Sequence, residues 1–280
     1  MSNQYYYLVS GLHEIVPDEP KLSVSRLKFR EECREQVHPD DFKLIKKLFY
    51  PDDNANLYNI LLKTGKEFKD SGNYAEEALE EEIRTPETLP DYMVEFIELY
   101  RNKQFVKPDI SVENQLQHLF YGSLCSDENR FIRTWYRFDR NLKNILVGLN
   151  ARKYEFSFEN EIIGDNFCSE RIRTSGEHYF NLSKELDYIE SITNLFDHDD
   201  IVEMEKGIDH VKWDYLDELT TFDYFSIEAI MSFILKLGIA ERWLKLDKKA
   251  GNEFFNRINL DLQNSYEFPK EFALTGKKAA

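Results

Sequence analysis

The residues best suited to metal chemistry lie in one short run, Asp-His-Asp-Asp at 197–200. A histidine between carboxylates offers both nitrogen and oxygen ligands. Neighbouring residues on a helix point in different directions, so this run supplies no more than about two ligands by itself. His178 and His210 would have to complete a site from a distance, and no spaced motif such as HExxH connects them. An acidic helix N-terminus before Ile201 is the favoured interpretation, because carboxylates there stabilise the helix dipole.

A second catalytic interpretation rests on the dipeptide His198-Asp199. It resembles the short signature of HD-type phosphohydrolases, which are helical enzymes. No well-placed earlier histidine or later aspartate supports that resemblance. A soluble, helical, metal-dependent phosphohydrolase using His198 and Asp199 nevertheless stays as the alternative function.

The acidic run Glu76–Glu82 is the remaining candidate for acid–base catalysis. A solvated helix face explains it better, because carboxylates with altered pKa values need burial and such a run cannot all be buried. The chain also has no glycine-rich phosphate loop, no GxSxG motif and no Cys/His pair in a recognisable setting. We therefore expect a protein that is not an enzyme, with no catalytic, cofactor-binding or metal-ligating residues and no cofactor.

Charge and composition narrow the class of partner and the compartment. The formal net charge of −16 repels phosphate backbones, which makes nucleic acid an unsuitable partner. The three cysteines are isolated and odd in number, which favours a reducing cytoplasm. The N-terminus has no basic, apolar leader, and the most apolar window, Ala229–Ile239, is far shorter than the roughly 20 residues that cross a bilayer. Membrane association would then be peripheral, on the cytoplasmic face.

The elements that must position these residues are predicted to be helices. Glycine and proline are scarce, and apolar residues recur at steps of three and four from Phe131 to Leu149. This long helix is expected to begin after Ser126-Asp127 and to end near Gly148–Asn150. Another is expected from a cap at Ser226 to Asp247, with Gly238 inside it at a cost of about 1 kcal/mol unless packing requires a glycine. The three tryptophans are expected in the core: Trp135, Trp213 and Trp243.

Shorter helices and their connections complete this prediction. Asp40 is expected to cap a helix through Phe49, and Pro51–Asn54 to form a turn whose acidic residues begin the next helix. Two connections are expected, at 103–110 and at 164–176. Two segments, at 5–9 and 154–158, have strand-like composition, but we expect no strand there. Further helices are expected at about 73–83, 90–103, 111–122, 183–195 and 209–220, with a last one after Gly251.

An internal repeat lies on two of the predicted helices. The six residues Asn56–Leu61 recur 85 residues later as Asn141–Leu146, with five of the six positions identical. A third, eroded copy ends in Arg242–Leu244. Self-similarity at this spacing indicates a duplicated packing module, with the repeated segment at its entry and the asparagines not at a catalytic site.

These residues resemble the C/d family of V-type and archaeal-type rotary ATPase subunits. That family carries an acidic residue followed by Asn-Leu-x-x-Ile-Leu, to which Asp53–Leu61 and Asp139–Leu146 are similar. Its last repeat is similar to Phe225–Ile230 followed by Ile239–Leu244. The opening Tyr5–Leu12 resembles a bacterial group of otherwise uncharacterised proteins encoded alongside V-type ATPase subunits. This chain departs from the family in its shorter length and in lacking the Asn-Leu pair in the third copy.

The resemblance implies an all-α fold of three pseudo-repeated helical modules in an elongated or funnel-like arrangement, with units at 1–105, 106–195 and 196–280. It also implies a non-catalytic adaptor whose partners are the central-stalk subunits and the membrane rotor ring of a V-type ATPase. Such a part passes torque during ion-transport-coupled rotation and hydrolyses nothing. An assembly factor with the same fold is a further alternative.

Overall fold

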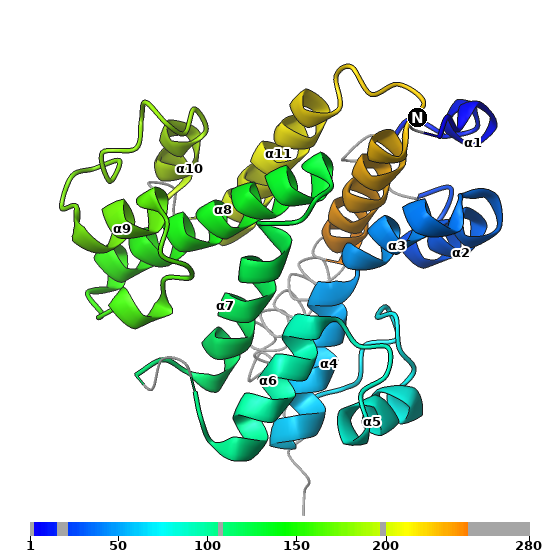
Figure 1. The fold of residues 1–280 in the computed structure, drawn as a ribbon. Helices are drawn as coiled ribbons and strands as arrows, with labels where there is room; N and C mark the ends of the chain where they lie inside the picture. Colours follow the sequence, from blue (N-terminus) through cyan, green and yellow to red (C-terminus); the bar gives the residue numbers. More distant parts are fainter. Residues whose placement is uncertain (1–2, 16–21, 106–108, 197–199, 246–280) are drawn as a thin grey trace, which may run out of the picture.

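The computed structural model describes residues 3–15, 22–105, 109–196 and 200–245 (Figure 1). Within these ranges every regular element is a helix and no strand occurs, which confirms the all-α prediction. The first elements are α1 (Tyr6–Ser10), α2 (Arg26–Gln36), α3 (Pro39–Lys47), α4 (Tyr50–Leu62), α5 (Glu76–Arg84) and α6 (Asp91–Asn102). They are followed by α7 (Val112–Leu124), α8 (Arg130–Tyr154), the 3₁₀ turn η1 (Glu159–Glu161), α9 (Phe167–Thr174), α10 (Ile189–Leu195) and α11 (Ile201–Leu219). Residues 227–245 are also helical.

Helices that follow one another mostly pack together, and the last described helix returns to the first ones. Neighbouring pairs include α6 with α7, α7 with α8, and α10 with α11. Helix 227–245 reaches α2, where Phe233 meets Phe29 at 4.9 Å between ring centroids. Glu241 of the same helix accepts a 2.7 Å hydrogen bond from the backbone N–H of Arg26. One continuous cluster of buried side chains therefore runs through all three predicted units.

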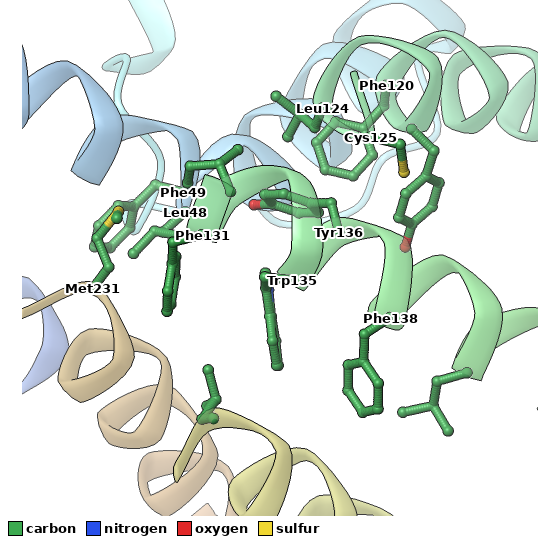
Figure 2. Packing of buried hydrophobic residues seen from close by; sticks show 14 of the residues in the cluster. Leu48, Phe49, Phe120, Leu124, Cys125, Phe131, Trp135, Tyr136, Phe138 and Met231 are labelled. Carbon is green, nitrogen blue, oxygen red and sulfur yellow. The ribbon is translucent and has the colours of Figure 1, made fainter. Parts of the chain in front are cut away.

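The centre of the core is α8, which buries aromatic side chains on more than one face (Figure 2). Phe138 stacks on Tyr215 of α11 at 3.9 Å between centroids. Tyr136 instead contacts Phe120 of α7, edge to face at 5.2 Å. The Tyr136 hydroxyl donates a 2.7 Å hydrogen bond to the carbonyl oxygen of Lys47, at the end of α3. The predicted burial of the three tryptophans is confirmed, with Trp135 on α8 itself.

The predicted bounds of α8 are wrong at both ends. It begins after Asn129, whose side chain accepts from the N–H of Ile132, and not directly after Ser126-Asp127. It continues past Gly148 and ends at Tyr154, with Glu155 in the left-handed conformation at φ 53°. Gly148 is a packing residue and not a helix stop, since a Cβ there would lie 2.9 Å from atoms of both Ile172 and Phe180.

Several shorter predictions also need correction. The cap of α3 is the His38 ring, which accepts from the N–H of Asp40. Residues 51–54 form the first turn of α4 and not a separate turn, because Pro51 fits a helix start, where no N–H is needed. The predicted connection at 164–176 contains α9, capped by Asn166.

Other predicted elements agree in place but differ in extent. Ser226 accepts from the N–H of Glu228, as expected for a cap. Helix α11 begins earlier than predicted, because Asp200 caps it, and α10 is shorter, because residues 182–188 form turns. The segment of strand-like composition at 5–9 is helical from Tyr6 onward and forms most of α1. The helix expected after Gly251 lies outside the described residues.

Two helical glycines allow a matched test of this packing. Gly148→Ala is expected to destabilise the fold by about 1–3 kcal/mol, because the new methyl group collides with Ile172 and Phe180. Gly238→Ala is expected to stabilise it by up to about 1 kcal/mol, since the nearest atom, Cδ of Arg26, is 3.4 Å from the added Cβ. Urea unfolding of both variants measures the two effects. Equal destabilisation by both would contradict the packing role of Gly148.

Candidate functional site

Among the described residues, the structure gathers none of the predicted candidates into a metal site. Asp197, His198 and Asp199 lie outside the described residues, so the alternative that depends on them stays untested. Asp200 caps α11 by accepting from the N–H groups of Val202 and Glu203, as the helix-terminus interpretation predicted. In the part of the chain that is described, no group of three or more His, Cys, Asp or Glu residues is placed to hold a metal ion.

The other predicted candidates make ordinary structural contacts. The His210 ring packs against Trp243 at 4.9 Å between centroids, and the His178 ring against Tyr179 at 4.5 Å. Most of the run 76–82 forms the exposed face of α5, and Glu82 accepts from the backbone of the following loop. The thiols of Cys33 and Cys125 are buried, and burial raises the pKa of Cys33 to about 12.

Two asparagines of the repeat make the same pair of hydrogen bonds in different places. The Asn56 amide accepts from the N–H of Lys69 at 2.8 Å and donates to the carbonyl oxygen of the same residue at 2.9 Å. The Asn144 amide accepts from the N–H of Ile163 at 2.9 Å and donates to its carbonyl oxygen at 2.8 Å. Both asparagines are fully buried. Each one clasps the loop that leaves its own helix, and we call these two arrangements the asparagine clasps.

The clasps correct the register of the repeat. Matching the six-residue segments pairs Asn56 with Asn141 and Asn59 with Asn144. In the structure Asn56 corresponds in role to Asn144, three residues further along than the sequence match places it. Asn59 instead bonds the Thr64 hydroxyl near the surface, at 2.8 Å. Two positions three residues apart lie on nearly the same face of a helix. Asn144 can therefore make the contact that Asn56 makes, although the sequence match pairs Asn56 with Asn141.

The third, eroded copy uses its polar residues differently. Arg242 bonds the carboxylates of Glu205, at 2.7 Å, and Asp209 of α11. The Trp243 indole N–H donates to the same Asp209 oxygen at 2.8 Å. Burial acts to lower the pKa of Arg242, but the bonds to Glu205 and Asp209 outweigh it and raise the pKa. This contact joins two helices and holds no loop.

A buried carboxylate lies beside the first clasp. Asp53 is fully buried in the first turn of α4 and accepts from the backbone N–H of Asn73 at 2.6 Å and from its side-chain amide at 2.5 Å. The approach is so close that a Cβ on Gly72 would lie 2.4 Å from the Asp53 oxygen. Burial raises the pKa of Asp53 to about 6, although these hydrogen bonds act to lower it.

Exposed aromatic side chains gather where α1 meets the loop between α11 and helix 227–245. Their exposed fractions are 60% for Tyr6, 88% for Tyr7, 88% for Phe222 and 69% for Tyr224. The two segments are joined by Phe225, whose ring lies 4.7 Å from that of Tyr6 and whose carbonyl accepts from the Tyr5 N–H at 2.7 Å. Figure 1 shows both segments at the same end of the molecule. We call Tyr6, Tyr7, Phe222 and Tyr224 the aromatic surface.

This surface is not among the sequence-based predictions. A signal was present, because Phe222 and Tyr224 lie in a short connection between two amphipathic helices, where no helical face can bury them. Clustered exposed aromatics are typical of sites that bind other proteins.

The sequence model of a family described as "Protein of unknown function (DUF2764)" matches residues 1–265. The chain belongs to the DUF2764 family. The match includes both asparagine clasps and the aromatic surface. No curated protein and no solved structure gives a significant match. None of the helices described for this DUF2764 protein is both long and apolar enough to cross a membrane.

The asparagine clasps predict unequal effects of three alanine substitutions in the DUF2764 protein. Asn144→Ala is expected to cost about 3 kcal/mol, because buried Ile163 loses partners for both of its backbone groups. Asn56→Ala is expected to cost about 1–2 kcal/mol, since water reaches exposed Lys69. Asn59→Ala is the control and is expected to cost less than about 0.5 kcal/mol. Urea unfolding gives all three values, and a loss at Asn59 as large as that at Asn144 would reject the corrected register.

The raised pKa of Asp53 predicts how the free energy of unfolding changes with pH. Its pKa is higher in the folded protein, about 6, than the ordinary value of 3.8, so its contribution is fully present below that ordinary value and is lost as pH rises through about 6. The free energy of unfolding of the wild type minus that of Asp53→Asn is expected to fall by about 2 kcal/mol between pH 4 and pH 7. Urea unfolding across this range measures the difference. A constant difference would show that Asp53 titrates normally.

Proposed function

We propose that this protein is a non-catalytic adaptor of a V-type ATPase, linking the central stalk to the membrane rotor ring. The observation that carries the proposal is the pair of asparagine clasps, which repeats one packing device in two parts of the chain. A repeated helical module is what the resemblance to the C/d family of rotary ATPase subunits implies. The similar segments at 53–61 and 139–146 are those that contain Asn56 and Asn144.

The contacts between helices suit a part that transmits force. Phe138 and Tyr136 tie α8 to α11 and α7, and helix 227–245 ties α11 back to α2. Close packing of this kind transmits strain and resists compression. A stiff body with an exposed aromatic surface fits an adaptor better than it fits an enzyme, because such a surface provides a contact area for another protein.

Photo-crosslinking in native membranes tests the proposal. A photoreactive amino acid at Phe222, a solvent-exposed position, is expected to yield peptides of the rotor ring or the central stalk, identified by mass spectrometry. The same amino acid at Glu80, on the exposed face of α5, is the matched control. The protein is also expected to stay with membranes through gentle washing and to leave when peripheral subunits are stripped.

Two results would reject the adaptor role. One is recovery of the protein solely in the soluble fraction of cells that contain the assembled ATPase. The other is crosslinking to neighbours that belong to no part of that ATPase. Crosslinks seen only while the ATPase assembles would favour the assembly factor instead.

A further inference from the structure

The aromatic surface borders two adjoining hollows. The first, of about 830 Å³, lies between α1 and α2 and is lined by Tyr6, Tyr7, Leu12 and Phe233 among others. The second, of about 480 Å³, is formed by the loop after α11 and is lined by Gln4 and residues 222–226 together with Glu228. The contact of Tyr6 with Phe225 connects them. Apolar side chains of a partner therefore have two neighbouring places to enter.

The second hollow is acidic as well as aromatic. Asp223 and Glu228 both line it, and Arg130 lies on their flank. Burial and the nearby charge of Glu228 raise the pKa of Asp223, while Arg130 acts to lower it. The carboxylates of Asp223 and Glu228 therefore repel each other, and a positively charged side chain of a bound partner would reduce this repulsion.

The end of α11 adds negative potential at the same place. Its last turn has no basic residue and contains Asp217 and Glu218, of which Asp217 is paired with Lys236. The carbonyl end of a helix carries a partial negative charge that cations stabilise. Phe222 comes three residues after the last residue of α11, and its ring is exposed.

We propose that the aromatic surface and its two hollows bind a basic amphipathic helix of a partner protein. The apolar stripe of that helix lies over Tyr6, Tyr7, Phe222 and Tyr224. A lysine or arginine beside the stripe reaches Asp223 and Glu228. Lys28 and Glu32 of the first hollow carry opposite charges, so the specificity for a cation comes from the second hollow.

Two other occupants fit the charges less well. A second copy meeting this surface about a two-fold axis would bring Asp223 and Glu228 against the same residues of its partner, in a chain of net charge −16. An anionic lipid surface would likewise meet carboxylates. A basic helix turns the same charges into attraction, which raises both affinity and association rate. This inference holds whether or not the protein works in a rotary ATPase.

The test uses two synthetic peptides and the purified full-length protein. One peptide is an amphipathic helix of leucine and lysine, and the other has glutamate in place of every lysine. Fluorescence anisotropy is expected to show binding of the lysine peptide at least about tenfold tighter than that of the glutamate peptide. Binding of the lysine peptide is expected to weaken as salt concentration rises.

Variants locate the binding. The double variant Phe222→Ser/Tyr224→Ser is expected to lose about tenfold in affinity for the lysine peptide. Glu228→Gln is expected to lose about threefold and to show a smaller salt dependence. The control pair Tyr154→Ser/Phe156→Ser removes exposed aromatics at the end of α8 and is expected to bind within about twofold of the wild type. Circular dichroism checks that each variant is folded.

Three outcomes would overturn the inference. Equal affinity for both peptides would remove the role of charge. Equal losses in the loop pair and the control pair would show general attraction to an acidic protein. A wild-type dimer in sedimentation that dissociates in Phe222→Ser/Tyr224→Ser would assign the surface to a second copy. Each result is obtained without the ATPase, so failure here leaves the adaptor proposal to the crosslinking experiment.

Discussion

The fold depends on the need of α8 to bury large aromatic side chains in opposite directions. Trp135 and Tyr136 are adjacent in the chain, and both are almost completely buried. Adjacent helical residues point about 100° apart, so one neighbouring layer cannot cover both. Helix α7 and the end of α3 cover Tyr136, while α11 lies on the other side, stacked on Phe138. Other helices therefore have to pack against α8 on both sides.

Sequence patterns predicted the helices well and their terminations poorly. The spacing of Phe131, Trp135, Phe138 and Leu142 is a property of a single helix, and it identified both α8 and its buried face. Gly148 was misread because a glycine at a helix end and a glycine beneath a packed ring are alike in sequence. Only the positions of Ile172 and Phe180, which come from later in the chain, distinguish the two cases.

The candidate site was less predictable for a related reason. Asn56 and Asn144 bond to the backbones of Lys69 and Ile163, and a residue that bonds through its backbone carries no signal of that bond in the sequence. The aromatic surface arises where α1 meets the loop after α11, two segments from opposite ends of the described chain. Local periodicity contains no information about such a meeting. Function is harder still to predict from the sequence, because what a contact surface does depends on its partner as well as on its own residues.

The asparagine clasps have a mechanical consequence. In each one, two hydrogen bonds join a single amide to the backbone of a single residue, so a force on the loop loads both bonds side by side. The two bonds therefore share that force, whereas in a zipper arrangement the bonds carry it one after another. Each clasp therefore fixes one point of its loop, Lys69 after α4 or Ile163 after α8, to the helix that precedes it. A force applied to the loop at that point passes directly into the middle of α4 or α8, without first passing along the residues that connect the loop to the end of the helix.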